Sequence, residues 1–326
     1  MSKFLKIISV ILVNVILLCA LFFLLDFIVF KYACKDFQRQ HPDDNRALHF
    51  SYRTDMTSYI SDLKHYFNGE GLYLGRLPDG TEYNNKTPVV VFGCSYAYGA
   101  YLNSNQTFSY KLAHLLKRPV YNRSAIGWSV QHMLYQTQSD ELYNDIPDTD
   151  TVIYVMIGDH IRRMQLEHFY IIDNWAYLHY SLKNNRFVLD NYNSKLSNFY
   201  RALYIRKLWN HIKAQEYATY NYNKMMKLHS LMFKYIKESK ENMEKRLGKK
   251  LNFIVIYYEP GNWGIPYKED LTQMLMADNI KVISTKELTN EDLSLQKYML
   301  KDMCHPSEAA WDLLTPLIAK KLNLTD

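Results

Sequence analysis

Short apolar runs recur along the last three quarters of the chain, and each is bounded by polar or turn residues. A continuous apolar run of this length is typical of a strand that is buried on both faces of a parallel sheet. These runs predict strands within 89–92, 119–127, 151–158, 252–260 and 280–284.

Longer stretches between these runs carry apolar residues every three or four positions, the spacing of one helix face. They predict helices over 108–116, 129–143 and 307–322. Strands that alternate with helices indicate an α/β fold, in which helices cover both faces of a parallel sheet. Active sites in such folds lie at the carboxyl ends of the strands.

Two segments depart from this alternation. Residues 71–85 predict a hairpin that turns at 78–80 (Pro-Asp-Gly). Residues 165–250 are too long for a plain crossover between strands, and we interpret them as an insertion beside the active site, either a lid or a wall that binds an acceptor. This insertion contains a hairpin-like stretch and two helical stretches, at 175–189, 196–213 and 222–247.

The N-terminus is strongly apolar from residue 7 to residue 30, with only Asn14 and Asp26 as interruptions. As a helix it spans about 36 Å, more than the roughly 30 Å of a bilayer core. No small-residue cleavage site comes after it. We therefore expect a transmembrane anchor over 1–30, a stalk over 31–70 and the main folded domain over 71–326; the disfavoured alternative for the apolar run is a buried core helix.

The orientation of this anchor rests on two opposing observations. Lys31, Lys35 and Arg39 come after the apolar run, whereas only Lys3 and Lys6 precede it, and this count slightly favours a cytoplasmic domain. Short N-terminal signal-anchors, however, usually export the domain on their C-terminal side. We expect a single-pass membrane protein with an extracytoplasmic domain.

Composition narrows the function. The net charge of +6 comes from scattered residues rather than a basic stripe, so no nucleic-acid partner is predicted. The four cysteines contain no Cys-x-x-Cys pair, so no structural zinc site is predicted. The 28 tyrosines reflect either composition bias or surfaces that contact sugars through flat rings with a polar tip.

Two short segments carry residues suited to acyl transfer. Gly93-Cys94-Ser95 comes directly after the first buried strand, which places Ser95 at the rim of the sheet with its N–H at a helix start. Asp302 stands three residues before His305, directly ahead of the last helix. In such a loop His305 can take a proton from Ser95 while Asp302 orients the imidazole. Taken separately, these residues also fit a helix N-cap and a capped loop.

The order of these segments resembles the SGNH/GDSL hydrolase superfamily over about 86–325, apart from the insertion. The resemblance implies a three-layer α/β/α, flavodoxin-like sandwich of SGNH-hydrolase type. It implies a catalytic triad of Ser95, His305 and Asp302. It also implies an oxyanion hole made by the N–H groups of Ser95 and of Gly127, which ends the 122–127 block.

The third block departs from the family pattern, which has Gly-x-Asn-Asp where this chain has Gly158-Asp159-His160. An ionised Asp159 facing an oxyanion would oppose catalysis, and loss of one oxyanion donor costs about 2.7–4 kcal/mol. We assign His160 as the replacement donor, with Arg162 or Arg163 as other candidates. The alternative is a structural pair between Asp159 and an arginine.

Two cysteines adjoin the proposed triad. If Ser95 and His305 meet, Cys94 and Cys304 lie close enough for a disulfide that would clamp the two loops; the alternative is two small buried residues that face different sides. Cys94 is also a rival nucleophile for His305. The resemblance selects Ser95, because only one of two adjacent side chains can point into the cleft.

Within this chemistry we expect a serine esterase that removes O-acyl groups, O-acetyl groups above all, from an envelope or extracellular glycan, without metal or organic cofactor. The same triad serves an O-acetyltransferase, and the anchor also brings lipid esters within reach. A catalytically idle, glycan-binding SGNH-like domain is the alternative from another class, since the third-block asparagine is missing.

Overall fold

The computed structural model describes residues 12–25, 28, 79–125, 128–146, 148–164, 180–184, 186–189, 221–260, 264–301 and 304–323. The chain divides into two compact units, and the larger one comprises residues 54–166, 177–190 and 219–326. In the smaller unit, residues 12–25 are helical. Among the described residues, no helix combines the length and the apolar character that crossing a membrane requires. The predicted stalk, 31–70, lies outside the described residues.

Five strands of the larger unit form one sheet in the order β2-β1-β3-β6-β7, and all neighbouring strands are parallel. The bounds of these strands are β1 Val89–Phe92, β2 Val120–Asn122, β3 Thr151–Met156, β6 Asn252–Tyr257 and β7 Lys281–Ser284. Each lies within a predicted apolar run, and the side chains of β1 and β3 are buried throughout. The strand predictions are confirmed, although the second, third and fourth runs extend past their strands into loops.

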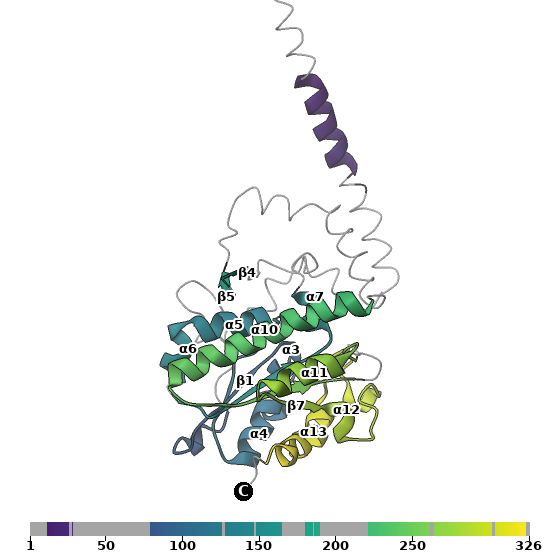
Figure 1. The fold of residues 1–326 in the computed structure, drawn as a ribbon. Coiled ribbons are helices and arrows are strands. Elements are labelled where there is room, and N and C mark those ends of the chain that lie inside the picture. The colour runs from purple at the N-terminus through teal and green to yellow at the C-terminus, as the bar shows by residue number, and fades with distance from the viewer. Residues whose placement is uncertain are drawn as a thin grey trace, which may run out of the picture. The chain divides into compact units, whose positions relative to one another are not determined.

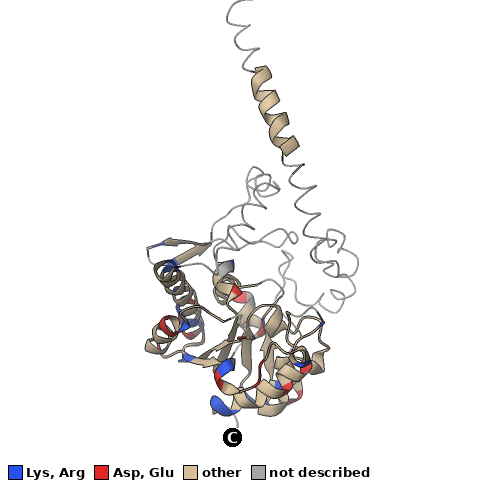
Figure 2. Ribbon diagram, turned by 90° about the vertical axis from the view of Figure 1, so that its right-hand side faces the viewer, with Lys and Arg blue, Asp and Glu red and all other residues tan. Residues whose placement is uncertain are grey.

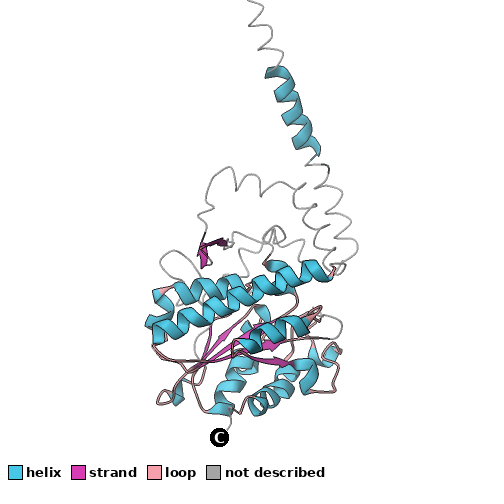
Figure 3. Cartoon of the chain, viewed as in Figure 1, coloured by secondary structure: helices cyan, strands magenta, loops and turns pink. Residues whose placement is uncertain are grey.

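Helices cover the sheet on both faces, so the predicted three-layer α/β/α arrangement is confirmed (Figures 1 and 3). Residues on alternate positions of the strands, such as Val91 and Val155, share a core with Phe108 and Trp311 on one face. That face carries α4 (Phe108–Leu116) and α13 (Glu308–Lys321). On the other face lie α5, α10 and α11, at Val130–Gln138, Tyr222–Leu247 and Lys268–Ala277.

The predicted helix over 129–143 is two helices, because Ser139 has an extended backbone (φ −87°, ψ 138°) that ends α5 before α6 (Asp140–Asp145) begins. The described part of the predicted 71–85 hairpin is also different: Thr81–Tyr83 is the 3-10 helix η4. The remaining short helices are α3 Ser95–Tyr98, η5 Ser104–Gln106, α7 Asp159–Arg163, α12 Thr285–Leu288 and η7 Gln296–Tyr298.

The segment interpreted as an insertion contains part of the sheet's own helical layer. Helix α10 lies on the connection from β3 to β6 and packs against α5 and α11, as a crossover helix does, whereas a lid or acceptor-binding wall elsewhere in 165–250 stays a prediction. The hairpin-like stretch contains a hairpin of β4 (Tyr180–Lys183) and β5 (Arg186–Leu189). Its Phe187 stacks on Tyr235 of α10, with ring centroids 3.8 Å apart. The predicted helix over 196–213 lies outside the described residues.

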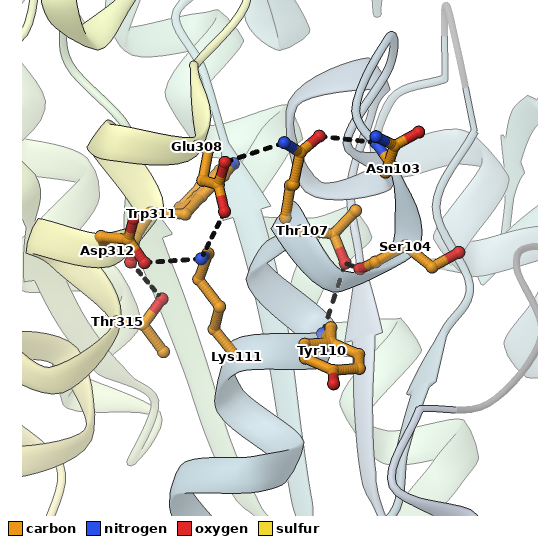
Figure 4. Close-up of polar contacts among 10 residues, drawn as sticks. Asn103, Ser104, Thr107, Tyr110, Lys111, Glu308, Trp311, Asp312 and Thr315 are labelled. Carbon is orange, nitrogen blue, oxygen red and sulfur yellow. Dashed lines mark hydrogen bonds and ion pairs between the residues drawn. The ribbon is translucent and has the colours of Figure 1, made fainter.

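Polar contacts join α4 to α13 at the sheet face that carries both (Figure 4). The Lys111 ammonium lies 2.5 Å from Asp312 and 3.5 Å from Glu308, and the Gln106 amide donates to Glu308 at 2.8 Å. Elsewhere, basic and acidic residues lie among one another along the outer helices (Figure 2). The α4–α13 contacts hold α13, which comes after the predicted base His305, against α4, which comes after the predicted nucleophile Ser95 and the short helix that it begins.

Candidate active site

The predicted nucleophile lies on a tight turn at the carboxyl end of β1. Cys94 is extended (φ −108°, ψ −156°) and caps α3, whose first residue is Ser95. A side chain at Gly93 would place its Cβ 2.7 Å from the Ala97 Cβ and 3.0 Å from the Val155 carbonyl oxygen. Only glycine therefore allows this turn to pack so closely against β3.

The predicted base meets the nucleophile. His305 Nε2 lies 2.8 Å from Ser95 Oγ, although the two residues are 210 positions apart in the sequence. The loop around the histidine is held by two backbone hydrogen bonds, from Leu300 N to His305 O at 2.8 Å and from Ser307 N to Tyr298 O at 2.9 Å. Asp302, the third predicted member of the triad, lies outside the described residues.

Hydrogen bonds of the Asn122 side chain join the loop after β2 to the turn that carries Ser95. The Asn122 amide donates to Ala97 O of α3 at 2.7 Å, and its Oδ1 accepts from Ser124 N at 3.1 Å. A Cβ on Gly93 would lie 3.5 Å from Ser124 Oγ, so this loop approaches the turn that carries Ser95. The approach suits a second oxyanion donor from this loop, but the predicted donor, Gly127, lies outside the described residues.

Asp159 forms the ion pair with an arginine that was the alternative for the third block. Its carboxylate accepts from the Arg163 Nε at 2.6 Å, and the same guanidinium donates to Trp128 O at 2.7 Å. His160 is 0% exposed, and its Nδ1 lies 2.6 Å from the Tyr154 hydroxyl. Burial lowers the pKa of His160, so its imidazole is neutral at physiological pH. Its assignment as an oxyanion donor stays a prediction.

Two roles were considered for Cys94: nucleophile in place of Ser95, and disulfide partner of Cys304. Its side chain is 0% exposed, and burial raises the pKa of its thiol, partly opposed by Arg163, so it remains protonated. Ser95 Oγ, not this thiol, contacts His305. Cys94 and Cys304 are not joined by a disulfide in the structure, so the alternative of two separate small residues holds.

Tyr96, which no sequence signal marks, bridges the two loops. Its hydroxyl forms a hydrogen bond with Cys304 Sγ (O–S distance 3.5 Å), and its ring centroid lies 5.4 Å from that of His305. Burial raises the pKa of Tyr96 well above its usual value, so the hydroxyl keeps its proton. Tyr96 adjoins the nucleophile and Cys304 adjoins the base, so we interpret their contact as positioning one against the other.

Removal of this hydroxyl is expected to reduce activity without unfolding the protein. Tyr96→Phe should lower kcat about threefold to tenfold, because loss of one modest hydrogen bond loosens the serine–histidine alignment. Cys304→Ala should give a similar loss, and the double variant should lose little more, since both changes break one contact.

The matched control is Tyr258→Phe. Tyr258 packs edge-to-face on Tyr96 at 5.3 Å, and its buried hydroxyl has no hydrogen-bond partner among the described residues. Hydrolysis rates and melting temperatures of all four variants check the interpretation. Equal losses of kcat in Tyr258→Phe and Tyr96→Phe, or additive losses in the double variant, would contradict it.

Among the described residues, no group of three or more histidine, cysteine or carboxylate side chains is arranged to hold a metal ion. The described site presents a serine hydroxyl in contact with an imidazole, beside a helix start and a tight glycine turn.

No protein-family model matches the sequence, and no curated protein does. Solved structures do match, at low identity. A lipase, Lip_vut3, from a goat rumen metagenome is 12% identical with a TM-score of 0.43, and the match covers 74% of this chain and 99% of the lipase. A lipolytic G-D-S-L family protein from Veillonella parvula is 13% identical with a TM-score of 0.41, covering 72% and 97%.

An acetyl xylan esterase, Est2A, from Butyrivibrio proteoclasticus is 12% identical with a TM-score of 0.42, and the match covers 74% of this chain and 65% of that one. Similarities this distant do not assign an activity. The function of this chain is therefore inferred from the geometry of Ser95 and His305.

Proposed function

We propose that the chain is a serine esterase of SGNH type that removes O-acyl groups, chiefly O-acetyl groups, from a glycan. The observation that carries this proposal is the 2.8 Å contact between His305 Nε2 and Ser95 Oγ at the carboxyl edge of the sheet. A serine at a strand-to-helix turn, in contact with an imidazole from a distant loop, is the arrangement that activates a hydroxyl for attack on an ester.

The reaction would run through an acyl-serine. Ser95 Oγ attacks the ester carbonyl while His305 Nε2 takes its proton, and the N–H of Ser95 at the start of α3 donates to the oxyanion. His305 then gives the proton to the leaving alcohol as the tetrahedral intermediate collapses. Water, deprotonated by His305, releases the acyl group as a carboxylic acid and regenerates Ser95.

The glycan assignment rests on the 28 tyrosines of the chain and on the aromatic surroundings of the base. The rings of Tyr96 and Tyr101 both lie 5.4 Å from that of His305. An O-acetyltransferase uses the same acyl-serine with a sugar hydroxyl in place of water, and remains the second candidate. The extracytoplasmic placement of the domain stays a prediction from residues 7–30.

A fluorophosphonate probe tests the activated serine directly. Intact mass of the full-length protein is expected to show one adduct in the wild type and none in Ser95→Ala, because the probe phosphonylates only an activated hydroxyl. Heat-denatured wild type serves as the control and should not react. A folded wild type that forms no adduct would refute the proposal and favour a glycan-binding domain without turnover.

Acetate release then separates the candidates. Release of acetate from acetylated oligosaccharides in water supports the esterase, whereas release that rises with added acceptor sugar, with an acetylated acceptor as product, supports the transferase. Faster release of long-chain acids from lipid esters would replace the glycan by a lipid substrate.

A further inference from the structure

Tyr101 is the most exposed large hydrophobic side chain in the described part of the protein, with 68% of its surface accessible. The residues on either side of it, Ala100 and Leu102, are buried. A backbone hydrogen bond from Leu102 N to Gly99 O, at 3.1 Å, closes the turn that carries it. The turn therefore anchors its flanking residues in the core and turns the tyrosine outward.

The backbone of Tyr101 is left-handed, with φ of 65°. Glycine and asparagine adopt this conformation readily, whereas a bulky aromatic residue does so at a cost in strain. Strain of this kind is tolerated where a side chain is needed at one place. The turn comes directly after α3, which begins with the nucleophile.

The ring of Tyr101 lies against the base. Its centroid is 5.4 Å from that of the His305 imidazole, and the two planes meet at 74°, an edge-to-face contact. During acyl transfer His305 gives its proton to the oxygen of the leaving alcohol, so the group attached to that oxygen must lie beside the imidazole. Tyr101 therefore stands on the alcohol side of the ester rather than on the acyl side.

We propose that Tyr101 forms a subsite for the sugar ring that carries the ester, so that the leaving alcohol is a pyranose stacked on the exposed face of the tyrosine. This inference rests on the proposed function and specifies its substrate. An open ring with a polar tip suits a sugar, whose C–H groups pack on the aromatic face while its hydroxyls stay in water. A long alkyl alcohol would gain most from an enclosed apolar surface, which a ring this exposed does not provide.

The test compares two esters that differ in their alcohol: glucose pentaacetate, whose acetyl groups are all on a pyranose, and ethyl acetate, whose alcohol has no ring. Tyr101→Asn removes the aromatic ring and fits the left-handed backbone. It should lower kcat/KM for glucose pentaacetate about fivefold to tenfold, mainly through KM, and change that for ethyl acetate less than about twofold. Tyr101→Phe, which keeps the ring, should remain close to wild type on both esters.

Tyr267→Asn is the matched control. Tyr267 is also an exposed tyrosine with a left-handed backbone (44% accessible, φ 53°), and its ring contacts Tyr222. Its substitution should leave both esters unaffected.

Three results would overturn the subsite. Equal losses on both esters in Tyr101→Asn would mean that Tyr101 acts on His305 alone, and no loss on either would mean that the ring binds nothing. If Tyr267→Asn lowered the rate on the sugar ester as much, the effect would not belong to Tyr101. Absence of any Ser95-dependent hydrolysis by the wild type would instead refute the proposed function itself, together with this subsite.

Discussion

Replacing His305 by alanine is expected to lower kcat for an acetyl ester by about 10⁴-fold to 10⁶-fold and to leave the fold intact. The imidazole is the group in contact with Ser95 Oγ, at 2.8 Å. Without it the hydroxyl keeps its proton and is a poor nucleophile. The side chain is only partly buried, so its loss creates little cavity and should shift the melting temperature slightly.

A double variant that combines His305→Ala with Ser95→Ala tests the pair more sharply than either single variant. Nucleophile and base act as one unit, so His305→Ala, Ser95→Ala and the double variant should all retain about the same residual rate. His114→Ala is the control. His114 belongs to α4, where it contacts Tyr83 at 3.3 Å, and its removal should leave kcat within about twofold. Losses that multiply in the double variant would show that the two residues act independently.

The contact between Ser95 and His305 could be predicted because two features of the sequence agree. One is the local sequence around each residue, and the other is the order of the two segments among the predicted strands and helices. A serine after a buried apolar run and a histidine before the last amphipathic helix each have an ordinary local explanation. In a parallel sheet, however, loops at the carboxyl ends of strands lie at one edge, so the strand–helix alternation brings both there. The same periodicity located all five strands, and it gave the bounds of β1, β7 and α13 nearly to the residue.

Features that depend on packing between distant segments could not be predicted in this way. The pairing of Tyr96 with Cys304 joins residues 208 positions apart, and nothing in either neighbourhood marks it. The packing of α10 on α5 and α11 depends on tertiary contacts, whereas the sequence shows only that 165–250 is long enough to suggest an insertion. A pair between Asp159 and an arginine was one of two interpretations of the third block, and the structure selects Arg163, which the i, i+4 spacing places on the same side of α7.

Gly93→Ala is expected to damage both the fold and the site. The added methyl would lie 2.7 Å from the Ala97 Cβ and 3.0 Å from the Val155 carbonyl oxygen. Neither neighbour is the flexible end of a side chain, so α3 must move away from β3. Overpacking of this kind costs about 1–3 kcal/mol of unfolding free energy. A shift of about 1 Å at the nucleophile costs about 10²-fold in kcat.

The matched control is Gly264→Ala, at a glycine where the new Cβ would meet, among the described residues, only Glu259 Oε1, at an ordinary 3.5 Å. Denaturant unfolding and acetate release on both variants separate two causes. A loss of kcat in Gly93→Ala that persists well below its melting temperature shows that the turn positions Ser95, since a merely less stable protein would regain full activity there. Full activity of a stable Gly93→Ala protein would mean that the turn tolerates a side chain, and that the close packing of α3 on β3 does not align the nucleophile.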